Sequence, residues 1–137
     1  MSDGPPAAPV AEGVISRPSS LPVDQAVSRL TELLTVKGTK LFAVVDHSGE
    51  ASRAGQDLPN TKLAIFGNPA AGTPVMVAAP LAALDLPLKL LIWEGENGQT
   101  WVSYNDVSYL VGRYGLPDEQ RAPLAAIDAL NTALGDS

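Results

Sequence analysis

Apolar residues recur along this chain in two patterns, and the change from one to the other separates helices from strands. Residues 23–34 predict a helix with one buried face, because their apolar positions fall at helical spacing: Val23, Ala26, Val27, Leu30, Leu33 and Leu34. Short apolar runs at residues 13–17, 40–45, 62–66 and 88–93 predict strands. The run at 40–45 is continuous and β-branched, which indicates a strand buried on both faces.

The stretch from residue 63 to residue 93 is expected to lie at the centre of the fold, because Asp85 and Lys89 are its only charged residues. Proline and glycine divide it. Thr73 as amino-terminal cap and Pro74 at the first helical position predict a short helix over residues 75–79. Pro80 should end this helix, and a turn then leads into the strand at 88–93. These interruptions argue against a continuous membrane-spanning helix.

The rest of the chain supplies a hairpin and further helices. Asn97-Gly98 predicts a tight turn, so the strands on either side of it should be antiparallel. Asn105 is expected to cap a helix over residues 106–114 that ends at Gly115, and the last helix should cover residues 118–134. We therefore predict an α+β fold, with an antiparallel or mixed sheet of about five strands packed against helices in a single domain from residue 13 to residue 137.

Composition and charge narrow the function. Residues 1–12 are rich in Pro, Gly and Ala and predict a disordered tail. They do not form a signal peptide, so we expect a cytoplasmic protein. The absence of cysteine excludes disulfides, thiolate metal sites and cysteine nucleophiles. A net charge of −6 without any basic block argues against a nucleic-acid partner.

Four features carry candidate chemistry, and each has a structural alternative. His47 is the only histidine: it could act as a general acid or base, or complete the end of a strand. One histidine without cysteine or a second histidine is a poor metal site. Gly67 to Pro74 could cradle an anion at a helix start, or form only a tight turn, and it lacks the lysine of a phosphate-binding loop. Lys89 either reaches solvent or lines a pocket.

The two strands at 41–45 and 62–66 lead to a composite site. If they lie side by side and point the same way, Asp46 and His47 emerge at the same sheet edge as Gly67 and Asn68. Free amides of the Thr73-Pro74 turn would then add to any imidazolium charge, which favours an anionic ligand. The candidate ligand-binding residues are Asp46, His47, Asn68, Gly72, Thr73 and Lys89.

Several ordered motifs resemble the family called domain of unknown function 302. They are FAVVDH at 42–47, FGNPAAGTPVM at 66–76, DLPLK at 85–89, WE at 93–94 and SYN at 103–105. The resemblance covers residues 13–134 and implies a small bacterial or archaeal α+β domain that tends to form dimers, with no assigned activity. Gly95 departs from the pattern, because an acidic residue is expected after Trp-Glu.

Three functions fit these features. The favoured one is a binding module, a homodimer that holds a small ligand or partner in a polar pocket near Asp46-His47 and the 67–73 loop. The alternative is a small enzyme that uses His47 as general acid or base on an anionic substrate. The third is an interaction protein without a small ligand. No triad, metal set or cofactor fingerprint is visible, so we expect no cofactor and no membrane partner.

Overall fold

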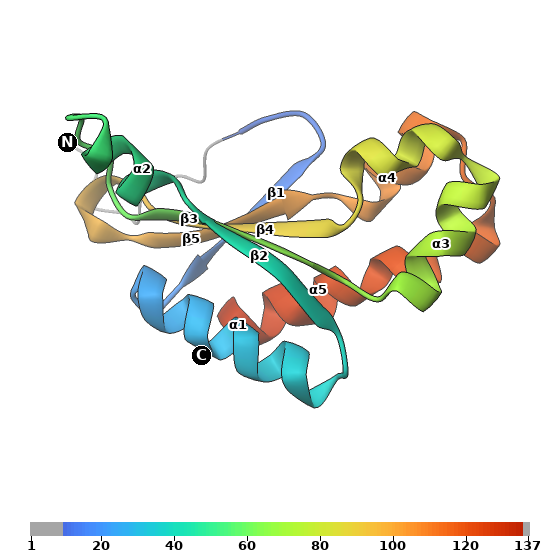
Figure 1. The fold of residues 1–137 in the computed structure, drawn as a ribbon, viewed down its shortest axis with the longest axis horizontal. Helices are drawn as coiled ribbons and strands as arrows, with labels where there is room; N and C mark the ends of the chain where they lie inside the picture. The colour runs from blue at the N-terminus through green and yellow to red at the C-terminus, as the bar shows by residue number, and fades with distance from the viewer. Residues whose placement is uncertain (1–9, 136–137) are drawn as a thin grey trace.

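The computed structural model describes residues 10–135, and its centre is a five-stranded antiparallel sheet (Figure 1). The strands lie in the order β1-β5-β4-β3-β2, and each neighbouring pair is antiparallel. Their bounds are Val14–Ser19 for β1, Lys40–Asp46 for β2, Thr61–Gly67 for β3, Leu88–Glu94 for β4 and Thr100–Asn105 for β5. The α+β prediction is confirmed, in its antiparallel form.

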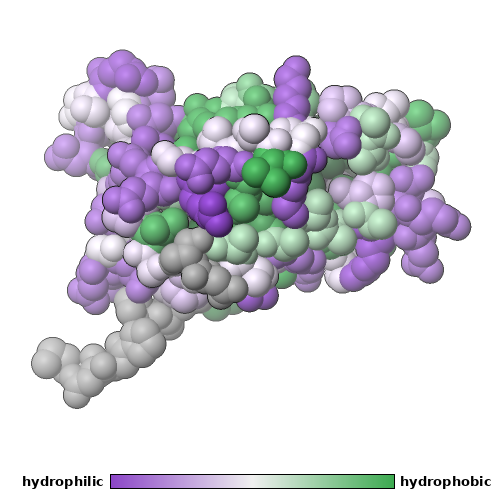
Figure 2. All heavy atoms as spheres, turned by 90° about the horizontal axis from the view of Figure 1, so that it is seen from below, coloured by the Kyte–Doolittle hydropathy of each residue, from purple (hydrophilic) through white to green (hydrophobic). Residues whose placement is uncertain are grey.

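Two long helices cover one face of this sheet. Helix α1 (Val23–Val36) packs on β2, β3 and β4, and α5 (Ala122–Gly135) packs on β1, β4 and β5. The core lies between the helices and the sheet; its largest fully buried side chains include Phe66, Leu30, Leu90, Ile92, Ile127 and Leu130. Seen from the helix side, apolar residues lie through the middle of the molecule among hydrophilic ones, and hydrophilic residues predominate toward its ends (Figure 2).

Shorter segments close the two ends of the sheet. Helix α2 (His47–Arg53) joins β2 to β3 at one end. At the other end lie α3 (Pro69–Ala78), the 3₁₀ helix η1 (Pro80–Asp85) and α4 (Val107–Tyr114), with α3 and α4 both in contact with η1 (Figure 1). The 3₁₀ turns η2 (Glu96–Gly98) and η3 (Asp118–Gln120) precede β5 and α5. Most of the predicted tail, residues 1–9, lies outside the described residues.

Strand β2 is not buried on both faces as its apolar run indicated. It lies at the edge of the sheet and pairs only with β3, and its side chains alternate poorly because the pairing shifts between Leu41 and Ala43. Phe42 and Val44 are 42% and 38% exposed. A continuous apolar run identifies a strand but does not tell a central strand from an edge strand.

Helix α3 begins at Pro69, five residues before Pro74, the predicted first helical position. Asn68 is the cap, and its side-chain Oδ1 accepts a hydrogen bond from the Ala70 amide at 3.0 Å. Thr73 lies inside the helix, where its hydroxyl donates to the Pro69 carbonyl at 2.7 Å. Pro74 is therefore an interior residue of α3. Asn68-Pro69 and Thr73-Pro74 are both valid start signals, and the structure uses the first.

The hairpin prediction is confirmed in its geometry. Asn97 and Gly98 have φ of 60° and 75°, the positive values that this type of turn requires, and β4 pairs antiparallel with β5. The next helix is displaced by one residue from the prediction. Asp106, rather than Asn105, caps α4, and its carboxylate accepts a hydrogen bond from the Ser108 amide at 3.2 Å.

One polar side chain sits in the middle of the core. Asn131 on α5 is fully buried, and neither its amide nitrogen nor its oxygen has a hydrogen-bond partner among the described residues. It lies beside the hydroxyl of Tyr104, which donates instead to Asp128. Burial, together with this carboxylate, raises the pKa of Tyr104 to about 12. A buried unpaired amide destabilises a fold, because it has lost water without gaining a partner.

Replacing Asn131 by leucine should therefore stabilise the protein. Leucine has a similar shape and carries no polar atom, so Asn131→Leu should raise the free energy of unfolding by about 1 kcal/mol. Urea denaturation of the variant and the parent protein measures the difference. A loss of stability of more than about 1 kcal/mol would show that the amide is hydrogen-bonded in solution.

Candidate functional site

A cavity of about 500 Å³ opens at the end of the sheet where β3 leaves it and β4 enters it. Helix α3 forms one wall and the first half of α5 forms the other. The base consists of the buried side chains of Phe66, Leu88, Leu124 and Leu130. Ligand sites in proteins are typically concavities of about 300 to 1,000 Å³ with mainly apolar walls. This cavity has the size and the lining of such a site.

The local sequence explains why space remains there. The sheet ends at Gly67, Asn68 caps α3, and the helix leads away from the strands instead of covering their ends. Gly72 and Ala71 present almost no side chain to the cavity. A Cβ built on Gly72 would meet no atom within 4 Å, so the space beside this glycine is open.

Polar groups stand at the rim of the cavity rather than at its base. Lys37 at the end of α1, Asn68 and Thr73 are exposed, and Thr39 is half-buried. The base residues, by contrast, are buried. A ligand in this cavity would place its apolar part inside and a polar end at the rim. The pocket at the 67–73 loop is thus apolar within, whereas a polar pocket was predicted.

The composite site predicted from the two strands does not form. Strands β2 and β3 lie side by side but run antiparallel, so Asp46 pairs with Lys62, and Lys40 pairs with Gly67. The Asp46-His47 corner therefore lies at one end of the sheet and Asn68 at the other. Seven residues of β2 separate them, or roughly 20 Å at the rise of an extended strand. The expectation of one shared cleft is wrong.

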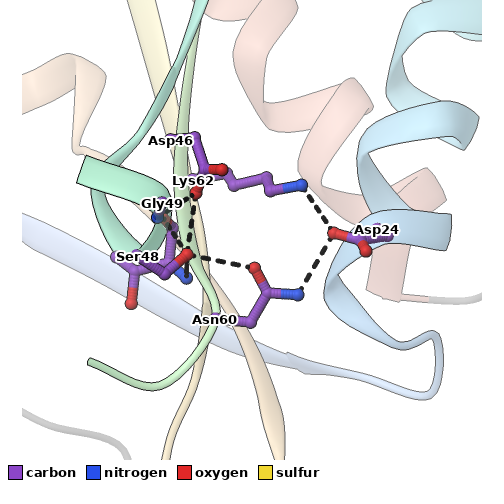
Figure 3. A network of polar contacts seen from close by, with 7 residues as sticks. Asp24, Asp46, Ser48, Gly49, Asn60 and Lys62 are labelled. Atoms are coloured by element: carbon purple, nitrogen blue, oxygen red, sulfur yellow. Dashed lines mark hydrogen bonds and ion pairs between the residues drawn. The ribbon is translucent and has the colours of Figure 1, made fainter. Parts of the chain in front are cut away.

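Asp46 instead belongs to a polar network that joins the β2–β3 connection to the start of α1 (Figure 3). Its carboxylate accepts hydrogen bonds from the Gly49 amide at 2.9 Å and from the Ser48 hydroxyl at 2.8 Å. The hydrogen bond from Gly49 has the largest effect and, together with that from Ser48, lowers the pKa of Asp46. The Ser48 hydroxyl in turn accepts from the Thr61 amide at 3.1 Å. Asp46 thus acts in the structure as the cap of α2.

The network continues across to α1 through Asp24. Its carboxylate accepts hydrogen bonds from Lys62 Nζ at 2.7 Å and from Asn60 Nδ2 at 3.1 Å. The Lys62 contact, followed by that of Asn60, lowers the pKa of Asp24. The Asp24 side chain is 67% exposed, so this ion pair is largely screened by water. The network orients the α2 corner against α1.

His47 and Lys89 both face away from the cavity. His47 is exposed at the first position of α2, and its side chain forms no hydrogen bond or ion pair with any residue between 10 and 135. Leu88, Leu90 and Ile92 of β4 point to the helices, so Lys89 lies on the opposite face of the sheet. Its Nζ donates to the Pro87 carbonyl at 3.2 Å.

The amides that the anion cradle needs are already occupied. Pro69 has no N–H, the Ala70 amide donates to Asn68 Oδ1, and the amides of Ala71 and Gly72 donate to the Asn68 carbonyl at 2.9 Å. Because α3 starts at Pro69, the Thr73-Pro74 segment offers no free helix start. The prediction of an anion bound by these amides is therefore wrong.

A second concavity, of about 520 Å³, lies at the opposite end of the sheet between the start of α1 and the β4–β5 turn. Polar side chains dominate its walls, among them Ser20, Asn60, Glu94, Asn97 and Gln99. Water solvates such groups well, so a small organic ligand gains less there than in the apolar cavity.

Sequence reasoning missed the residues that the rest of the chain contributes to the cavity. The candidate residues from the sequence do not include Lys37, Phe42, Leu124 or Leu130, all of which line the cavity. Nothing in their local sequence marks a cavity. They meet there because β2, α3 and α5 pack at the same end of the sheet.

The comparison with protein families agrees with the motifs. The family model described as "Domain of unknown function DUF302" matches residues 15–134, which is most of the chain. This chain belongs to the DUF302 family.

Other DUF302-like proteins show the fold and one wider context. A crystal structure of an uncharacterized conserved DUF302 protein from Bacillus stearothermophilus aligns with 92% of this chain and 98% of its own, with a TM-score of 0.75 and 22% identity. That likeness shows the fold. The fluoride-specific ion channel FluC 1 of Brucella suis is 36% identical over 113 residues, 82% of this chain and 44% of its own length.

FluC 2 of Brucella melitensis is also 36% identical, over 42% of its length. The chain thus spans less than half the length of these curated relatives, whose names describe the whole proteins. No helix within residues 10–135 of the DUF302 chain has the length and apolar character that crossing a membrane requires. The same residues contain no group of three or more His, Cys, Asp or Glu side chains placed to hold a metal ion.

The neighbours Asp46 and His47 should respond differently to mutation. Asp46→Ala removes the cap of α2 and should lower the urea midpoint. His47→Ala removes an exposed side chain and should change the free energy of unfolding by less than about 0.5 kcal/mol. Urea titrations of both variants test this contrast, and a larger loss for His47→Ala would contradict the placement of His47 on the surface.

Proposed function

We propose that this DUF302 chain is a small-ligand-binding module whose site is the apolar cavity between α3 and α5. The observation that carries the proposal is the cavity itself, about 500 Å³ in volume, with buried aromatic and aliphatic side chains at its base. Each square ångström of apolar surface removed from water contributes about 25 cal/mol to the free energy of binding. A molecule with an apolar body would gain affinity by removing from water its own apolar surface and that of the partly exposed lining residues Phe42, Met76 and Pro87.

Binding is favoured over catalysis by what the cavity wall lacks. The described residues that line it include no histidine, aspartate or glutamate, so the wall offers no group that exchanges protons near neutral pH. Lys37 is the charged residue among them. The alternative, a small enzyme that uses His47 on an anionic substrate, would have to operate from the exposed corner at α2. That activity stays a prediction.

The Brucella relatives favour a second candidate function. A segment similar to this chain forms part of proteins named as fluoride-specific ion channels, which suggests that a DUF302 module can work beside a channel. Fluoride itself does not suit the apolar cavity, because a small hydrated anion loses water there without gaining donors. In this second function, too, the cavity would bind an organic ligand.

Self-association and a cytoplasmic location also stay predictions. The aromatic side chains of the β4–β5 hairpin give little support to homodimer formation, because Trp101 and Tyr104 are only 5% and 4% exposed. Trp93 is half-buried, and its indole N–H donates to the Ser103 hydroxyl at 3.0 Å. The unpaired edge of β2, where Phe42 is exposed, is the surface on which a second chain could add a strand.

Filling the cavity should weaken the binding of a neutral apolar probe. Gly72→Phe places a ring where the structure leaves open space, and Ala126→Phe does so from the α5 wall. Both should weaken binding of 1-N-phenylnaphthylamine at least about tenfold, measured by fluorescence titration. Neither change should unfold the protein, because glycine and an exposed alanine are replaced on helix surfaces.

The matched control is Gly112→Phe in α4. Gly112 also has no atom within 4 Å of a built Cβ, but it does not line the cavity. This variant should bind the probe as the parent protein does. Equal binding by all four proteins would place the probe elsewhere and contradict the proposal, provided that circular dichroism shows each variant folded.

A further inference from the structure

We infer that the ligand of the α3–α5 cavity carries one acidic head group, which Lys37, Thr39 and Asn68 hold at the rim. The inference rests on the proposed function and specifies the class of ligand: an aliphatic or aromatic body with a single carboxylate or similar acid. It does not involve His47 or the amides of α3, because His47 faces away from the cavity and those amides already donate hydrogen bonds.

Hydrogen-bond donors outnumber acceptors at the rim. Lys37 can only donate. Asn68 already accepts the Ala70 amide on its Oδ1, so its remaining hydrogen-bonding group is the Nδ2 amide, which donates. The Thr39 hydroxyl has no hydrogen-bond partner among residues 10–135 and can donate as well. Thr73 is the exception, because its hydroxyl donates to Pro69 and leaves only lone pairs. An acceptor-rich head group completes this arrangement.

The charged side chains at and beside the rim are positive, which also favours an acidic head group. No aspartate or glutamate is found among the described residues that line the cavity. Lys40 lies next to it, with its Nζ 4.8 Å from the ring centre of the lining residue Phe42. Neither Lys37 nor Lys40 takes part in an ion pair within the described part of the chain, whereas Lys62 and Arg113 do. A chain of net charge −6 thus has two lysines beside its apolar cavity that form no ion pair with residues 10–135.

The end of α1 does not cancel this charge. The carbonyls of Leu33, Leu34 and Thr35 accept hydrogen bonds from the amides of residues 37–39 and are not free to face a ligand. The residual negative end of the helix dipole favours a charged lysine at this position. Lys37 therefore adds a positive charge next to the apolar space. One lysine in the lining suits one acidic group, which makes a monoacid the expected ligand.

Decanoate and 1-decanol form a matched pair of probes, since they share the apolar chain and differ in the head group. Isothermal titration at pH 7.5 with the full chain should show both binding, with decanoate at least about fivefold tighter, equivalent to roughly 1 kcal/mol. Added salt should reduce this ratio, because the rim is open to water. Lys37→Gln should bring the ratio close to one and leave the affinity for decanol unchanged.

Lys89→Gln is the control, because Lys89 lies near the same end of the sheet but on the opposite face. It should bind both probes as the parent protein does. Equal affinity for the two probes, or a ratio unchanged in Lys37→Gln and in the Lys37→Gln/Lys40→Gln double variant, would overturn the inference and leave the proposed function standing. Binding of neither probe would overturn the proposed function and the inference with it.

Discussion

The antiparallel pairing of β2 with β3 determines where the polar motifs of this protein can act. Because Asp46 pairs with Lys62 while Lys40 pairs with Gly67, the carboxyl ends of the two strands lie at opposite ends of the sheet. The α2 corner then becomes a capped connection tied to α1, and the turn after β3 becomes the start of α3. The distance of His47 from the cavity follows from this separation.

The cavity forms because α3 leads away from the sheet, whereas the neighbouring helix α5 packs over it. Asn68 and Pro69 direct α3 away from the strand ends, and α5 starts on the far side of the space so formed. The apolar ends of β3 and β4 close its base. Close packing would normally fill such a space with side chains. Here the facing positions on the helices, Ala71, Gly72, Ala122 and Ala126, are too small to do so.

Local signals in the sequence predicted the elements well and their partners poorly. The hairpin at Asn97-Gly98 and the apolar face of α1 were correct because each depends on neighbouring residues alone. The start of α3 was wrong because two Asx/Thr-Pro signals compete within six residues. The edge position of β2 and the direction of its pairing could not be read from its composition, since both depend on strands distant in the sequence. The motif at 67–73 lies beside the proposed cavity, but its sequence did not indicate the apolar surroundings.

The proposed ligand site lies at the α3–α5 end of the sheet and not at the Asp46-His47 corner. A nitrogen-15 HSQC titration of the full chain with 1-decanol tests it residue by residue. Binding in the cavity should shift the amides of residues 67–76 and 122–130 and leave those of residues 46–53 unchanged. Shifts concentrated at residues 46–53, with the α3 and α5 amides unmoved, would contradict it.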